Sequence, residues 1–105
     1  MFIESYRINL SKHNLNILKK IQLKYISIVK FYIFGSRLKT SYISRSDLDI
    51  MLIWKDKKYK KLYYKLLEEI EESNITIICD LVNYDEVCSA FLQEIQRNMI
   101  FIMYV

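Results

Sequence analysis

The chain has 105 residues, 52% of them hydrophobic and 27% charged, which is the balance of a globular protein and excludes a disordered one. This length suits a single domain, residues 1–105, and excludes separate catalytic, acceptor-binding and regulatory domains. Lysine and arginine outnumber aspartate and glutamate by 16 to 12, a net charge of +4 that fits an acidic or phosphate-bearing partner but does not by itself indicate nucleic-acid binding.

The sequence gives no sign of export or of a membrane span. Its longest apolar run, residues 99–105, is far shorter than the roughly 18 residues that cross a bilayer. The first residues lack the cationic segment and cleavage site of a signal peptide. Cys79 and Cys88 lack the spacing of a zinc site or a disulfide framework. We therefore expect a cytoplasmic protein with no membrane partner.

The first part of the chain predicts a helix and then a strand. Ser11 is a suitable N-cap for a helix whose apolar positions recur every three or four residues. These positions are Leu15, Leu18, Ile21 and Tyr25. Residues 28–34 are β-branched and aromatic and stop at Gly35, so they predict a buried strand followed by a polar stretch from Ser36 to Ser46.

The rest of the chain alternates strands and helices. Residues 47–54 and 75–82 predict two further strands, and Asp56 can cap a long helix between them that ends at Asn74. The apolar face of that helix consists of Tyr59, Leu62, Leu66 and Ile70. We expect a last helix, from about Asp85, to direct Val87, Phe91 and Ile95 to the core, and the tail from Ile100 to form a short edge strand. The fold class is α/β (α+β), a small mixed β-sheet packed by helices on at least one face.

Three aspartates stand on two of the expected strands. Side chains alternate along a strand, so Asp47 and Asp49 share one face with Cα atoms roughly 7 Å apart. Asp80 interrupts an apolar strand where burial is costly without a partner or a metal. If the two strands are neighbours, the three carboxylates form a triad, and Mg²⁺ would relieve their repulsion and take part in phosphoryl transfer. A solvated surface or a turn is the alternative for the Asp pair taken alone.

Gly35 and Ser36 follow the first strand directly. Gly35 is the one glycine of the chain, and its place between an aromatic strand and a serine is conspicuous. Glycine at such a junction lets backbone N–H groups approach a phosphate closely. An ordinary tight turn is the alternative interpretation.

Together these residues resemble the minimal nucleotidyltransferase (MNT) family of the DNA polymerase β superfamily. The resemblance rests on Phe34-Gly35-Ser36-Arg37, on Ser46-Asp47-Leu48-Asp49-Ile50 after a polar gap, and on Asp80-Leu81-Val82 in a later strand. It implies a polymerase-β-like nucleotidyltransferase fold with ATP as substrate and two Mg²⁺ ions. Carried over residue by residue, it implies nucleotide binding by Gly35 and Ser36 with support from Arg37 and Ser46, and catalysis and metal binding by Asp47, Asp49 and Asp80.

The resemblance also implies a partner. Stand-alone proteins similar to this one pair with a HEPN-domain RNase toxin and act as the antitoxin of a type VII toxin–antitoxin system, transferring AMP from ATP to a tyrosine of the toxin. Thr40 stands where the family usually has a second small residue. The alternative is therefore a weak or inactive module that neutralises its partner by complex formation. A polymerase fragment needs a basic channel that this chain is too short to build, so direct nucleic-acid binding is not expected.

Overall fold

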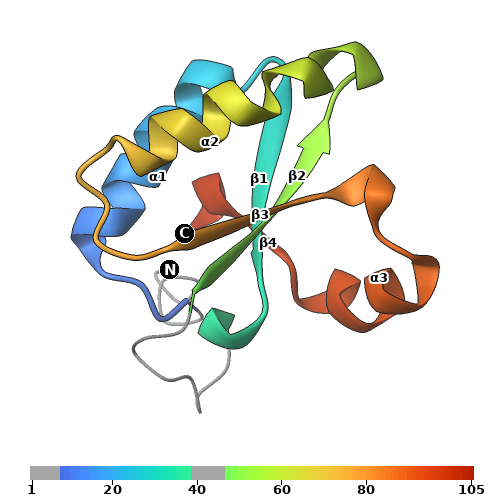
Figure 1. Ribbon diagram of the computed structural model, residues 1–105. Helices are drawn as coiled ribbons and strands as arrows, with labels where there is room; N and C mark the ends of the chain where they lie inside the picture. The colour runs from blue at the N-terminus through green and yellow to red at the C-terminus, as the bar shows by residue number, and fades with distance from the viewer. Residues whose placement is uncertain (1–7, 39–46) are drawn as a thin grey trace.

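The computed structural model describes residues 8–38 and 47–105, which form helices and strands in alternation (Figure 1). The helices are α1 (Lys12–Tyr25), α2 (Tyr63–Glu71) and α3 (Ser89–Ile95), and the strands are β1 (Val29–Phe34), β2 (Leu48–Trp54), β3 (Cys79–Asn83) and β4 (Ile100–Phe101). Short 3-10 helices lie between them, among them η2 (Ser36–Leu38), η3 (Lys57–Leu62), η4 (Tyr84–Glu86) and η6 (Ile102–Tyr104).

The described strands form one mixed sheet in the order β3-β2-β1-β4. β1 runs antiparallel to both β2 and β4, whereas β2 and β3 run parallel. The expected mixed sheet and the expected edge strand at Ile100 are therefore confirmed. The pair of β2 and β3 matters most for the site, because directly paired residues of neighbouring strands lie side by side on one face of the sheet and these two strands carry Asp49 and Asp80.

One face of the sheet carries the main core and is covered by α1 and α2 (Figure 1). Leu48, Ile50 and Leu52 alternate along β2 and are fully buried on this face. They pack in one cluster with residues of the expected helix faces, namely Leu18, Ile21 and Tyr25 of α1 and Leu66 and Ile70 of α2. Ser11 caps α1 as expected, because its side chain accepts a hydrogen bond from the backbone N–H of Asn14.

A buried glutamine completes β1 where its neighbour strand is too short. β4 pairs only with Tyr32 and Ile33 of β1. Gln22 of α1, which is fully buried, accepts a hydrogen bond from the Phe31 N–H at 2.6 Å and donates one to the Val29 carbonyl at 2.9 Å. Its amide therefore satisfies backbone groups that would otherwise be buried without a partner.

Three expected elements are shorter than the sequence suggested. The segment after Asp56 starts as 3-10 turns, with the Asp56 side chain accepting the Lys58 N–H, and becomes an α-helix only at Tyr63. The third strand starts at Cys79 and not at Ile75, because Cys79 is paired with the first residue of β2 and earlier residues have no strand opposite them in the described chain.

The last helix was also predicted wrongly in its start and its burial. α3 begins at Ser89 and not at Asp85, and none of its residues is fully buried. Phe91 is 39% exposed and makes an edge-on ring contact with Phe34 at 6.1 Å between centroids. The helix therefore contacts the sheet through the Phe91 ring and does not bury its whole apolar face in the core.

The described part of the chain has no membrane-spanning helix and no disulfide bond. None of its helices is long and apolar enough to cross a membrane. Cys79 and Cys88 are free thiols, as their spacing predicted, and burial raises the pKa of the half-buried Cys79 thiol to about 12.

The contact between Tyr25 and Glu69 gives a test of how α1 and α2 are joined. The Tyr25 hydroxyl donates to Glu69 Oε1 at 2.7 Å, and this bond is the main reason that the pKa of Glu69 is lowered from 4.5. We expect Tyr25→Phe to lower the free energy of unfolding by about 1 kcal/mol at pH 7 in urea titrations. A carboxylate whose pKa is lowered by folding stabilises the fold at pH values above its pKa in the unfolded chain. The loss of stability in Tyr25→Phe should therefore become smaller as the pH falls below 4.5.

The control for this prediction is Tyr64→Phe, because Tyr64 is 77% exposed on α2. This variant should leave the free energy of unfolding unchanged at pH 7 and at pH 3. An equal loss at pH 7 and pH 3 in Tyr25→Phe would show that the bond to the ionised carboxylate is not what the hydroxyl contributes.

Candidate active site

The sheet brings Asp49 and Asp80 side by side. Asp49 of β2 is the register partner of Asp80 of β3, and both lie on the face opposite the buried Leu48 and Ile50. Asp47 lies immediately before β2, two residues from Asp49, and is exposed. The parallel neighbour that the sequence argument required is therefore present. Asp80 is exposed on β3, which is at the edge of the described sheet, so its carboxylate does not bear the cost of burial.

The three carboxylates influence one another electrostatically. Asp49 is half-buried, and burial raises its pKa, with further increases from the negative charges of Asp80 and then Asp47. A divalent cation bound by these oxygens would offset that repulsion, so the chemistry of the donor set fits Mg²⁺. Among the described residues, however, no group of three or more acidic, histidine or cysteine side chains is close enough to hold a metal ion. Metal binding by the triad therefore stays a prediction.

Gly35 is in contact with the central carboxylate of the site. It directly follows β1 with φ +84°, in the left-handed region that residues with a Cβ rarely adopt. A Cβ added at Gly35 would lie 2.3 Å from Asp49 Oδ2 and 3.1 Å from Asp49 Cγ. Both the backbone conformation and the available space therefore require glycine, and the turn after β1 is held against the carboxylate of β2.

Arg37 anchors the turn that starts at Gly35. Its side chain is 5% exposed and donates from Nη1 to the Asn9 carbonyl at 2.8 Å. The Arg37 carbonyl in turn accepts from the Asn9 backbone N–H at 2.7 Å and from Asn9 Nδ2 at 2.9 Å. Asn9 gave no signal in the sequence. Ser36 begins η2 directly after Gly35, whereas Ser46 and Thr40 lie outside the described residues.

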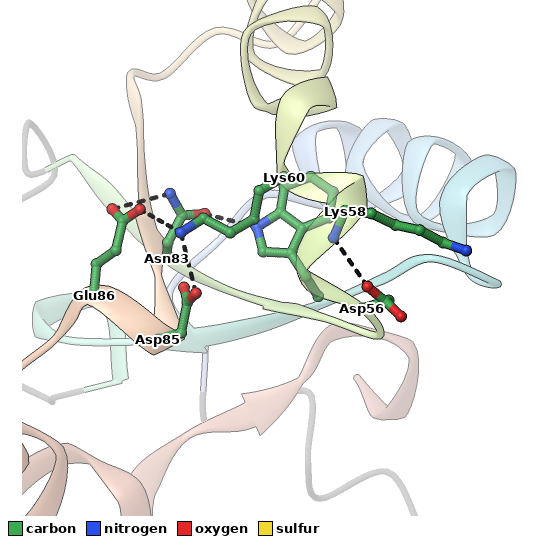
Figure 2. A network of polar contacts seen from close by, with 7 residues as sticks. Asp56, Lys58, Lys60, Asn83, Asp85 and Glu86 are labelled. Atoms are coloured by element: carbon green, nitrogen blue, oxygen red, sulfur yellow. Dashed lines mark hydrogen bonds and ion pairs between the residues drawn. The ribbon is translucent and has the colours of Figure 1, made fainter.

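The strand that carries Asp80 is bonded by two side chains that the sequence argument did not identify. The Tyr63 hydroxyl donates to the Leu81 carbonyl at 3.1 Å, and Trp54 Nε1 donates to Asn83 Oδ1 at 2.7 Å. Figure 2 shows Asn83 beside Glu86 and the Lys60 ammonium between Asp85 and Glu86. One lysine of the basic run 57–61 therefore neutralises acidic groups of this chain.

Comparison with known proteins identifies the family. The sequence model of the family described as "Polymerase beta, Nucleotidyltransferase" matches residues 16–104. The chain belongs to the polymerase beta nucleotidyltransferase family. Its match spans the Gly35 turn and all three aspartates, so the nucleotidyltransferase kind of the domain is established together with its fold.

A solved structure shows the same fold as this nucleotidyltransferase domain. A chain of the crystal structure of the toxin–antitoxin MntA–HepT superposes with a TM-score of 0.60 at 19% sequence identity. The superposition covers 88% of this chain and 71% of that chain. Comparison with curated proteins gives no match. The expected polymerase-β-like fold is confirmed.

The contact between Gly35 and Asp49 can be measured by a double-mutant cycle. We expect Gly35→Ala to lower the unfolding free energy by about 2 kcal/mol, because it adds left-handed strain and a clash with the Asp49 carboxylate. In an Asp49→Ala background the clash with the carboxylate is gone, and the cost should fall to about 1 kcal/mol of backbone strain. Equal costs in the two backgrounds, measured by urea unfolding, would contradict the contact.

Proposed function

We propose that this nucleotidyltransferase is a Mg²⁺-dependent protein adenylyltransferase, with residues 1–105 as a minimal domain acting in the cytoplasm. In this proposal it is the antitoxin of a type VII HEPN/MNT pair and transfers AMP from ATP to a tyrosine of the HEPN RNase toxin. The observation that carries the proposal is the position of Asp49, which lies between the Gly35 turn and Asp80.

Each residue of the site has a role in the proposed reaction. The backbone of Gly35 and Ser36 binds the triphosphate, because glycine allows a close approach, and Ser46 supports it. Arg37 acts as an anchor of the turn through Asn9. Asp47, Asp49 and Asp80 would hold two Mg²⁺ ions, which supply neutralisation of the phosphate charge.

The transfer itself conserves all atoms of donor and acceptor. Asp80, at the open edge of the sheet, takes the proton of the acceptor hydroxyl. The acceptor oxygen forms a bond to the α-phosphorus of ATP, and the bond from that phosphorus to the bridging oxygen breaks. Pyrophosphate leaves on the side opposite the incoming hydroxyl.

The partner is inferred from the structural comparison. The chain of MntA–HepT that this fold resembles is part of a toxin–antitoxin assembly. A similar assembly gives this small domain a source of the acceptor hydroxyl, which supports a toxin as both partner and substrate. Fold similarity alone does not transfer a partner, so the acceptor must be tested directly.

A second function is favoured by one observation of the described residues. Their acidic side chains are not grouped closely enough to hold a metal ion as they stand. A module that has lost catalysis could still neutralise its partner by covering it. Such a module would tolerate the loss of Asp49, whereas an enzyme would not.

The proposal predicts a mass change on the toxin partner. We expect the intact mass of a HEPN toxin that binds this chain to rise by one or more adenylyl groups after incubation with the chain, ATP and Mg²⁺. Asp49→Asn should lower the rate at least 100-fold, because the central oxygen ligand of the site is lost. Asp56→Asn, which removes a carboxylate from the cap of η3, is the matched control and should keep the rate.

Two results would contradict the enzyme. The first is an unchanged mass while the wild type still binds and inhibits the toxin. The second is inhibition of the toxin by Asp49→Asn to the same extent as by the wild type, which would favour the module that acts by complex formation.

A further inference from the structure

A cavity lies beside β3, next to the strand position of Asp80. Its volume is about 490 Å³, within the range of cavities that take small organic groups. Its apolar and aromatic lining comes from Tyr63 and Tyr64 at the start of α2, from Leu81 and Val82 of β3, and from Val87 after η4. The two strand residues of the lining lie on opposite faces of β3, Leu81 on the core face and Val82 on the face of Asp80, so the cavity reaches the carboxylate face at Val82.

The aromatic side of the cavity is partly fixed and partly open. The Tyr63 ring is held by its hydroxyl bond to the Leu81 carbonyl at 3.1 Å. The Tyr64 ring stands edge-on to it, at 5.0 Å between centroids, and Tyr64 is 77% exposed. An exposed ring beside a fixed ring offers the edge and face contacts that aromatic groups prefer.

The polar rim of the cavity is already paired. Lys60 forms ion pairs with Glu86 at 2.6 Å and with Asp85 at 3.0 Å, as Figure 2 shows. Asn83 donates to Glu86 and accepts from Trp54. Because the one lysine is paired with two carboxylates, no cation of this cluster is left for an anion, and the rim suits a neutral aromatic ring better than a phosphate.

The strand order separates this cavity from the Gly35 turn. Gly35 directly follows β1 and contacts Asp49 of β2. Across the sheet, Asp80 is on the next strand, β3, and the cavity is lined by β3 residues that come after Asp80. In phosphoryl transfer the attacking and leaving oxygens lie on opposite sides of the phosphorus. If the phosphates of ATP bind at Gly35, the acceptor therefore approaches from the side of β3. Val82 shares the face of Asp80 and lies roughly 7 Å along the strand, a distance that a phenol ring can bridge.

We infer that the cavity receives the aromatic ring of the acceptor side chain, with its hydroxyl directed to Asp80. This inference rests on the proposed function for the identity of the reaction, but the binding of a ring can be measured without any reaction. It assigns the contacts of the acceptor ring to Tyr64, Val82 and Val87.

The test is a titration of the full chain with N-acetyltyrosinamide, followed by the methyl NMR signals of Val82 and Val87. We expect saturable shifts of both, with no shift of the Val29 methyls, which lie outside the cavity lining. Tyr64→Ala should weaken binding at least fivefold, and Val87→Phe, which places a ring of its own in the cavity, should also weaken it. Tyr104→Ala is the matched control, because Tyr104 is also exposed, at 72%, and does not line the cavity.

Each outcome decides the inference. No saturable shift with N-acetyltyrosinamide, or an equal affinity in Tyr64→Ala, would overturn it. Shifts produced by adenosine and not by the tyrosine derivative would also overturn it, since the cavity would then belong to the donor base. Ring binding without adenylyl transfer to any acceptor would instead contradict the proposed function and leave the ring site standing.

Discussion

The contact between Gly35 and Asp49 is the constraint on which the site depends. The turn after β1 reaches the carboxylate of β2 because Gly35 has a positive φ and no Cβ, and a methyl group at this position would meet Asp49 Oδ2 at 2.3 Å. The antiparallel pairing of β1 and β2 sets the level of this contact, with Phe34 opposite Asp49. The parallel pairing of β2 and β3 then brings Asp80 to the same level. The relative positions of Gly35, Asp49 and Asp80 therefore follow from the registers of these two strand pairs.

The two sides of the sheet divide stability and chemistry between them. One face is buried under α1 and α2, and Gln22 completes the backbone bonding of β1 from that side. The other face carries the carboxylates, half-buried or exposed, beside the buried Met51 and Phe34, and the Phe91 ring of α3 contacts Phe34 there. β3 has no outer strand in the described chain, and the Tyr63 hydroxyl bonds its backbone instead. The open edge is thus stabilised without being closed to an incoming acceptor.

The sequence predicted those features that depend on local pattern. Apolar spacing located α1, β1 and β2, and a second strand beside Asp49 was correctly expected to carry Asp80. The position of Gly35 predicted a close approach to a phosphate, and its contact with the Asp49 carboxylate was not foreseen. The start of α3, the bonds of Gln22 and Asn9, and the pairing of Lys60 with Asp85 and Glu86 could not be predicted. Each depends on which distant segments meet, and residue types along one segment carry no such information.

The most direct test of the account is the location of a bound divalent cation. Mn²⁺ added to the ¹⁵N-labelled chain with a non-hydrolysable ATP analogue broadens the amide signals of nearby residues. The account predicts that the signals of Gly35, Asp49 and Asp80 broaden most, and that Asp49→Asn removes the effect. Broadening centred on Asp85 and Glu86, or spread evenly over the chain, would contradict a metal-dependent nucleotide site between the Gly35 turn and β3.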